Sequence, residues 1–359
     1  MSKVVKRILI TGNEACAEGA IRAGCRFYAG YPITPQNELI GYMSKRMREA
    51  GGTFIQAESE LAAINMVFGA AAAGERAMTS SSGPGISLKQ EGISYLSGCE
   101  LPAVVVNVMR GGPGLGNIAP SQSDYFQATR GGGHGDYRTI VLAPASVEEF
   151  ATFAFDAFDL ADKYRIVTLV LTDGALGQMM EPVPGSLFSD MKPAKRQSKK
   201  GWILDGCRGR KARSIKSLFL KDGELEELNK KLQRKYEEIS KKEVRCEVLY
   251  EKDSEIFLIA YGIVARIVKS CVEKMRKNGL KVGVIRPITL WPFPNDIISK
   301  AVSKAKSMLV VEMSEGQMVE DVRLAVGDKC KVRFYGRSGG NIPTEDEITK
   351  ILIDSRRGK

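Results

Sequence analysis

The sequence has a single histidine, and its seven cysteines are scattered along the chain without a CxxC pair. Structural zinc sites and iron–sulfur clusters need closely spaced ligands, so we expect this chain to hold no metal centre of its own. The odd cysteine count and the irregular spacing argue against a disulfide framework and indicate reduced thiols in a cytoplasm. Acid–base chemistry must therefore depend on carboxylates or on a cofactor.

Membrane, targeting and nucleotide-binding signals are missing as well. The longest apolar run, Leu61 to Gly74, is too short to span a bilayer, and the basic N-terminus is followed by too few apolar residues for a signal peptide. The chain has no GxxxxGK[ST] motif and no GxSxG motif, and its GGPGLG stretch lacks the spacing of a dinucleotide-binding loop. The sequence thus predicts neither a P-loop protein, nor a dinucleotide-binding protein, nor a serine hydrolase.

The chain is long, with 359 residues, and 43% of them are hydrophobic. Its positive charge is distributed unevenly along the sequence. The net charge is +11, and the residues from Asp190 to Tyr250 hold 18 Lys and Arg against 10 Asp and Glu. This stretch ends in a charged helical pattern with one apolar face, so we expect a basic connector with an amphipathic helix. A nucleic-acid-binding element is the alternative, but aromatic residues are sparse there.

On both sides of the connector, short apolar runs alternate with helical patterns. The run Ala103–Met109 is nearly continuous in β-branched residues, as is typical of a strand buried on both faces of a parallel sheet. We predict an α/β fold with a doubly wound domain at 1–185, the connector at 186–250 and a smaller α/β domain at 251–359. A short buried strand is expected at Arg7–Thr11.

In an open parallel sheet, binding sites lie at the carboxyl ends of the strands. In this chain those ends carry Thr34, Arg110, Asp173 and a Ser/Gly/Pro loop at Ser80–Gly85. Thr34 is also well placed to cap a helix that begins at Pro35.

Glu60 is the strongest single candidate for chemistry. It begins a helix that is apolar nearly all round, so its carboxylate is expected at the edge of a packed interior, where it would be either paired or functional. The alternative is that Glu58 and Glu60 are simply first-turn acids that favour the helix dipole.

The surroundings of Glu60 resemble the pyrimidine-binding domain of thiamine diphosphate enzymes. Small residues follow it at Ala62 and Ala63, and a Ser-Gly-Pro-Gly loop comes after the next strand. Companion motifs occur in order along the chain: Tyr31-Pro-Ile-Thr-Pro35, Glu58-Ser-Glu60, Ser82-Gly-Pro-Gly85, Arg110-Gly-Gly-Pro-Gly-Leu-Gly116 and Gly133-His134-Gly-Asp136. Together they resemble the α subunit of 2-oxoacid:ferredoxin oxidoreductases over essentially the whole chain, and most closely the branched-chain, 2-oxoisovalerate type.

This resemblance implies a subunit of an enzyme that oxidatively decarboxylates 2-oxoisovalerate, transfers the acyl group to coenzyme A and reduces ferredoxin. It implies that Glu60 activates the aminopyrimidine of thiamine diphosphate, that Thr34 and Arg110 meet the substrate, and that His134 lies near the reacting centre. A lone histidine in a glycine-rich turn could equally serve to fix the loop. The residues implied to line the cofactor are Glu60, Ser82, Gly83, Pro84 and Gly85. The second domain resembles the transketolase C-terminal domain.

The resemblance also implies that the chain holds half of an active site. The magnesium pattern GDG is absent, because Gly135-Asp136 is followed by Tyr137 and Gly327-Asp328 by Lys329. Mg²⁺ and the iron–sulfur clusters are therefore expected on partner subunits, namely a diphosphate-binding β subunit, a γ subunit and a ferredoxin-like δ subunit, with no nucleic acid or membrane as partner. Two alternatives stay open: the α subunit of a 2-oxoglutarate enzyme, and a non-catalytic partner-binding or nucleic-acid-binding protein on the same scaffold.

Overall fold

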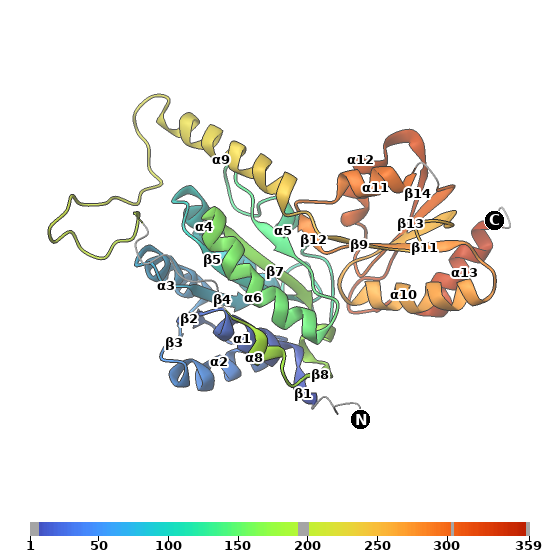
Figure 1. Cartoon of the computed structure of the whole chain (residues 1–359), viewed down its shortest axis with the longest axis horizontal. Coiled ribbons are helices and arrows are strands. Elements are labelled where there is room, and N and C mark those ends of the chain that lie inside the picture. Colours follow the sequence, from blue (N-terminus) through green and yellow to red (C-terminus); the bar gives the residue numbers. More distant parts are fainter. Residues whose placement is uncertain (1–6, 193–200, 303–304, 357–359) are drawn as a thin grey trace.

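The computed structural model describes residues 7–192, 201–302 and 305–356. Two sheets organise the chain (Figure 1), and we call the parts around them the first and the second domain. The first sheet has seven strands in the order β12-β6-β7-β5-β4-β2-β3, and only the β12–β6 pair is antiparallel. Its strands are β2 (Phe27–Gly30), β3 (Thr53–Gln56), β4 (Ala77–Ser81), β5 (Ala103–Met109), β6 (Ile140–Leu142), β7 (Val167–Asp173) and β12 (Thr289–Trp291).

Helices cover both faces of this sheet. One face carries α1 (Gly12–Arg22), α2 (Asn37–Glu49) and α6 (Val147–Tyr164), and the other carries α3 (Glu60–Ala72), α4 (Gly83–Gly98) and the short α5 (Tyr125–Thr129). Strand β5 is completely buried, and its side chains alternate between the two cores: Val104 and Val106 pack with α6, whereas Val105 packs with α3 and α4. The predicted doubly wound fold is confirmed.

The strand expected at Arg7–Thr11 exists as β1, but it lies outside the main sheet. It pairs antiparallel with β8 (Met180–Pro184) in a two-stranded sheet, and its first three residues are exposed. The expectation of a buried strand was wrong, because only Ile10 faces a core, which it shares with Leu176 and Val183. Two short helices, α7 (Gly174–Gln178) and α8 (Leu187–Asp190), flank β8.

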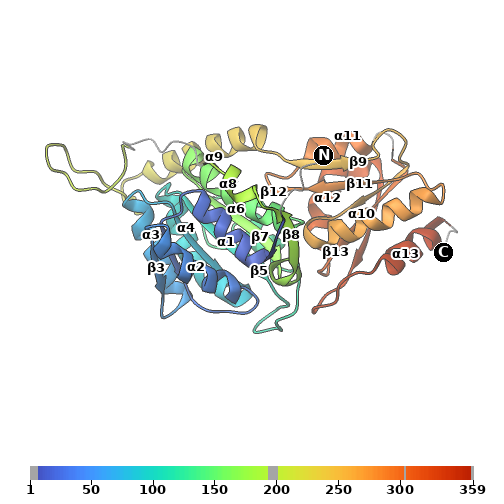
Figure 2. The same cartoon turned by 60° about the horizontal axis from the view of Figure 1, so that its bottom comes forward.

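The connector has two parts. Residues 201–223 project from the first domain (Figure 2), and α9 (Glu224–Lys242) then lies against it. The apolar face of α9 is buried at Leu232, Tyr236 and Ile239 in the same core as α6. Part of the predicted basic segment, at 193–200, lies outside the described residues.

The second sheet has the order β14-β13-β10-β11-β9, with only β9 antiparallel. Its strands are β9 (Cys246–Leu249), β10 (Ile256–Ile259), β11 (Val282–Pro287), β13 (Ser307–Glu312) and β14 (Lys331–Gly336). Helices α10 (Gly262–Lys277) and α13 (Glu345–Arg356) cover one face, and α11 (Asn295–Val302) and α12 (Met318–Val326), followed by the 3₁₀ turn Gly327–Lys329, cover the other.

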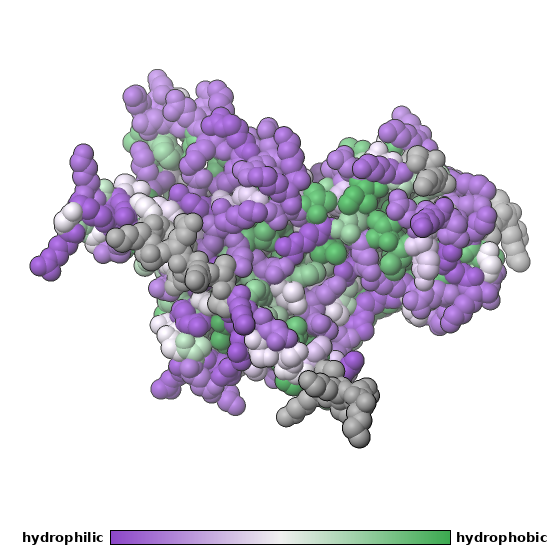
Figure 3. Space-filling view, in the orientation of Figure 1, coloured by the Kyte–Doolittle hydropathy of each residue, from purple (hydrophilic) through white to green (hydrophobic). Residues whose placement is uncertain are grey.

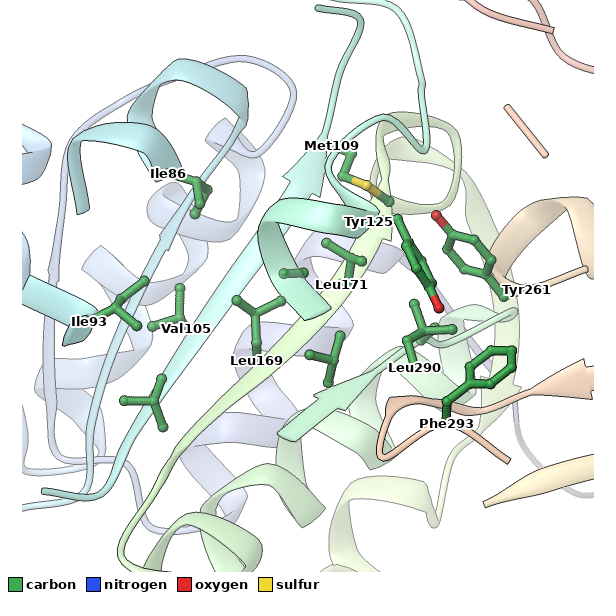
Figure 4. Packing of buried hydrophobic residues seen from close by; sticks show 14 of the residues in the cluster. Ile86, Ile93, Val105, Met109, Tyr125, Leu169, Leu171, Tyr261, Leu290 and Phe293 are labelled. Carbon is green, nitrogen blue, oxygen red and sulfur yellow. The ribbon is translucent and has the colours of Figure 1, made fainter. Parts of the chain in front are cut away.

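The two domains share one continuous core. Figure 4 shows Tyr125 of the first domain beside Tyr261 of the second, with their ring centroids 5.8 Å apart. Strand β12 also reaches across, because it follows β11 in the chain but pairs with β6 of the first sheet. The sequence analysis did not anticipate this crossing, and the division at residues 185 and 250 stays a prediction.

A groove of about 1270 Å³ runs along the junction between the domains, near the apolar surface that Figure 3 shows there. Its apolar lining includes Leu290, Trp291, Phe293 and Leu324, and none of the candidate site residues is part of it. Among the described residues, no helix combines the length and the apolarity needed to cross a membrane.

Candidate active site

The candidate residues gather at the carboxyl edge of the first sheet. Glu60 is the first residue of α3, where the Ser59 side chain caps the helix by accepting a hydrogen bond from the Ala62 N–H (3.1 Å). This cap orients the first turn so that Glu60 is buried, with 6% of its surface exposed, whereas Glu58 is exposed. Of the two carboxylates that the sequence offered, only Glu60 faces the interior.

The segment from Ser82 to Gly85 is the start of a helix, not the loop expected from the sequence. Ser82 is the N-cap of α4, and Gly83, Pro84 and Gly85 form its first turn. The expectation was wrong because Pro is favoured in a first helical turn. Gly83, just before it, takes a positive φ of 40°, a conformation that glycine adopts without strain. A Cβ on Gly85 would lie 2.5 Å from Oε1 of Glu60, so only glycine allows α4 to approach the carboxylate this closely.

Arg110 follows β5 directly, and 7% of its surface is exposed. Its Nη1 donates to the Thr34 carbonyl (3.1 Å) and its Nη2 to the Leu115 carbonyl (3.2 Å). The guanidinium therefore joins the loop after β2 to the loop after β5. Its side chain also lies beside the first turn of α4, with Cγ 3.5 Å from the place that a Cβ on Gly83 would take.

Thr34 does not cap a helix, contrary to expectation. Helix α2 begins at Asn37 with Gln36 as its N-cap residue, and the Gln36 side chain accepts a hydrogen bond from Ser80 Oγ on β4 (2.6 Å). This buried hydrogen bond fixes Gln36 against β4, so the helix begins only after Gln36, two residues beyond Thr34. The Thr34 hydroxyl accepts only a long hydrogen bond from Asn37 Nδ2 (3.4 Å) among the described residues, so it can still bind another group.

His134 does not lie with the candidate residues around Glu60. Its carbonyl accepts a hydrogen bond from Ser94 Oγ (2.8 Å), and Ser94 lies nine residues beyond Gly85 on α4, about 13 Å along the helix axis. The histidine is exposed in its glycine-rich loop, and the structure does not bring it to Glu60. These contacts agree with the alternative in which His134 fixes the loop.

Two charged residues near the site were missed, the half-buried Asp124 and the fully buried Lys89. Asp124 accepts a hydrogen bond from Asn107 Nδ2 on β5 (3.0 Å); burial raises the pKa of Asp124, while that hydrogen bond and the Arg110 charge act against the rise. Lys89 on α4 has no exposed surface and donates from Nζ to the Glu60 carbonyl (3.2 Å). No local pattern marks either residue, because their surroundings come from distant segments.

The polar atoms of this site fit a heteroaromatic ring with hydrogen-bonding edges. Ser81 Oγ, Ser82 Oγ and Arg110 Nε are buried and have no partner among the described residues. Within those residues, the Glu60 carboxylate accepts no hydrogen bond either. Buried donors and acceptors are normally satisfied, so this set is suited to a ligand that supplies complementary groups. The aminopyrimidine of thiamine diphosphate is such a ligand.

Comparison with known families gives the same result. The family model "Pyruvate flavodoxin/ferredoxin oxidoreductase, thiamine diP-bdg" matches residues 18–201, and "Pyruvate:ferredoxin oxidoreductase core domain II" matches residues 254–348. The fold and the site thus define a thiamine diphosphate-binding oxidoreductase chain.

The relatives name the family more closely. The ketoisovalerate oxidoreductase subunit VorB of Methanothermobacter marburgensis is 50% identical over 96% of both chains. The 2-oxoglutarate synthase subunit KorA of Methanocaldococcus jannaschii is 37% identical over 95% of this chain and 98% of its own. The chain belongs to the 2-oxoacid:ferredoxin oxidoreductase family, as predicted.

A solved structure has the same fold. The 2-oxoglutarate:ferredoxin oxidoreductase from Magnetococcus marinus, determined with 2-oxoglutarate, coenzyme A and succinyl-CoA bound, is 28% identical and superposes with a TM-score of 0.90 over 97% of this chain. This chain spans 65% of the length of that one.

Proposed function

We propose that this chain supplies the cofactor-activating half of the active site of a branched-chain 2-oxoacid:ferredoxin oxidoreductase. The observation that carries the proposal is the buried Glu60 side chain, which begins α3 beside Gly85 and near Ser81 Oγ, a hydroxyl group with no partner among the described residues. The higher identity to the ketoisovalerate subunit (50%) than to the 2-oxoglutarate subunit (37%) supports 2-oxoisovalerate as the substrate.

Thiamine diphosphate, when bound, supplies the electron sink for the decarboxylation of a 2-oxoacid. Glu60 is placed to share a proton with a weakly basic ring nitrogen, since its carboxylate lies at the edge of the packed interior. Arg110 can bind the substrate carboxylate with a planar edge, because its Nε has no partner among the described residues. Thr34 has a hydroxyl that is free to meet the carbonyl of the same substrate.

The surface beside the site is suited to partner subunits. Leu61, which follows Glu60 in the sequence of α3, is 43% exposed, and Leu88, which precedes Lys89 in α4, is 53% exposed. Each helix therefore presents an apolar residue to the outside. The partners of this proposal are the β, γ and δ subunits, which contribute Mg²⁺, the diphosphate site and the iron–sulfur clusters. Coenzyme A is the second substrate and ferredoxin the electron acceptor. All seven cysteines are free thiols, in agreement with a cytoplasmic complex.

The test is turnover by the complex purified from its native host. A panel of 2-oxoacids with coenzyme A and a viologen dye should give the highest kcat/KM with 2-oxoisovalerate. Glu60→Gln should lower kcat by about 10²- to 10⁴-fold, as is typical when an acid–base group is removed. Glu58→Gln is the matched control, because the same change two residues earlier affects an exposed side chain.

Near-normal turnover by Glu60→Gln would contradict the assignment of Glu60. A preference for 2-oxoglutarate in the panel would favour the alternative α subunit. Absence of turnover, together with steeply salt-dependent nucleic-acid binding by the chain, would favour the non-catalytic alternative.

A further inference from the structure

Lys89 is a fully buried lysine beside the candidate catalytic acid. It has no exposed surface, although lysine is among the residues least often buried completely. Its Nζ donates to the backbone carbonyl of Glu60 (3.2 Å), and it makes no ion pair within the described part of the chain. A protonated lysine has three N–H groups, so this single acceptor leaves the ammonium poorly satisfied.

The position of Lys89 follows from close packing between α3 and α4. Gly85, Lys89 and Gly92 lie on successive turns of α4, on the face toward α3. A Cβ on Gly85 would lie 2.5 Å from Oε1 of Glu60, and a Cβ on Gly92 would lie 2.6 Å from Cγ1 of Ile64. Glycines on both sides of Lys89 thus bring the helices into contact, and the lysine is enclosed between them at the first turn of α3.

We propose, on the basis of the proposed function, that Lys89 is a positioning residue for the reaction. Its hydrogen bond to the Glu60 carbonyl holds the first turn of α3 against α4, and so keeps the Glu60 carboxylate in place beside Gly85.

Glu60 is the charged partner of this lysine. Burial lowers the pKa of Lys89 to about 7, and the Glu60 charge opposes that decrease. The other titratable groups on α4 and on the segments packed against it interact elsewhere: Glu91 accepts from Tyr95 OH (2.8 Å), Tyr137 donates to Gln90, and His134 contacts Ser94. Asp173, at the end of β7, accepts from the N–H groups of α7.

Loss of this hydrogen bond removes the contact by which Lys89 fixes the first turn of α3 beside α4. The Glu60 carboxylate is then held less firmly in place beside Gly85, so cofactor affinity and kcat should both decrease.

Two variants separate the hydrogen bond from the charge. Lys89→Gln keeps a donor for the Glu60 carbonyl but has no charge, whereas Lys89→Met has neither. In the assembled complex with saturating Mg²⁺, the dissociation constant of thiamine diphosphate is measured by titration, and kcat is measured at saturating cofactor. Lys230→Met is the control, since it removes one positive charge from an exposed position on α9.

We expect Lys89→Met to weaken cofactor binding and to lower kcat by about 5- to 10-fold each, and Lys89→Gln to retain most of both, because it keeps a donor for the Glu60 carbonyl. In a Glu60→Gln background, Lys89→Met should give no further loss of kcat, because the carboxylate that Lys89 positions has been removed. Lys230→Met should leave both quantities unchanged.

If the wild-type complex does not bind thiamine diphosphate, the proposed function fails, and this inference fails with it. If the wild-type complex binds the cofactor and Lys89→Met binds it and turns over like the wild type, only the inference fails. An equal loss of kcat from Lys89→Met in the presence and absence of the Glu60 carboxylate would also overturn it.

Discussion

Arg110 and Lys89 are two cations that this fold buries in different ways. Arg110 donates from its two Nη groups to the carbonyls of Thr34 and Leu115, and its Nε has no partner among the described residues. Lys89 has one carbonyl acceptor and a pKa of about 7, which burial lowers. The planar fork of arginine allows structural and ligand contacts at once, whereas a buried lysine acts mainly as a point charge.

Arg110→Lys therefore tests the substrate contact. Lysine keeps the charge but cannot bind two carbonyls and present a planar edge, so we expect the KM for the 2-oxoacid to rise by about 10-fold or more, with a smaller change in kcat. Steady-state kinetics of the complex measure both constants. Arg138→Lys, at an exposed arginine that donates to the Thr129 carbonyl, should leave KM unchanged. An unchanged KM in Arg110→Lys would remove Arg110 from the substrate site.

At the scale of elements, the site depends on how closely α4 approaches α3. Gly85 and Gly92 lie about two turns apart on the same face of α4, and each takes a place where a side chain would overlap α3. Ordinary helix pairs keep their axes 8–10 Å apart, with the distance set by the side chains in contact. The two glycines thus place the first turn of α4 beside the Glu60 carboxylate.

Gly92→Ala should destabilise the chain for this reason. The added methyl group would overlap the Ile64 side chain, and overpacking of a core costs about 1–3 kcal/mol in the free energy of unfolding. Gly69→Ala on α3 is the control, because nothing lies within 4 Å of its Cβ position, and alanine there should stabilise by up to about 1 kcal/mol. Urea denaturation followed by circular dichroism measures both; equal midpoints for the two variants would contradict this packing.

At the scale of the whole molecule, Gln122 connects the loop after Arg110 to the second domain. Its Nε2 donates to the Tyr261 carbonyl (3.0 Å), and its Oε1 accepts from the Met313 N–H (3.0 Å). Its own N–H donates to the Met313 carbonyl (2.8 Å). These partners lie just beyond the carboxyl ends of β10 and β13, so the second sheet supports the loop that Arg110 holds from the other side.

Gln122→Ala should loosen this connection. It leaves the buried Met313 N–H without its partner, at a cost of about 1–3 kcal/mol. It also removes one of two hydrogen bonds to the Tyr261 carbonyl, which accepts another from the Ala265 N–H (3.3 Å). Thermal unfolding should show a lower midpoint, and the KM for the 2-oxoacid should rise because the Arg110 loop loses its support. Gln233→Ala removes a comparable hydrogen bond at an exposed position, to the Asp136 carbonyl (3.0 Å), and should change stability by less than about 0.5 kcal/mol. If the two variants unfold at the same temperature, Gln122 is not the connection proposed.

The sequence by itself determined the features that depend on neighbouring residues. The run Ala103–Met109 became a fully buried strand with the predicted bounds, and Glu60 became the first residue of a helix, with its own side chain buried. Both follow from short-range patterns, namely β-branched continuity and an apolar helical run that begins after Glu60. The order of the motifs was enough to predict the family.

The tertiary structure alone decided the features that depend on distant segments. Thr34 does not cap a helix because Ser80, which is distant in the sequence, forms a hydrogen bond with Gln36. The segment Arg7–Thr11 lies outside the main sheet because it pairs with β8. Lys89 meets Glu60 because glycines bring two helices together, and His134 is held away from Glu60 by Ser94. The roles of the site residues stay predictions. The physical reason is that a local pattern shows which residues face a core, while packing between distant segments decides which atoms meet there.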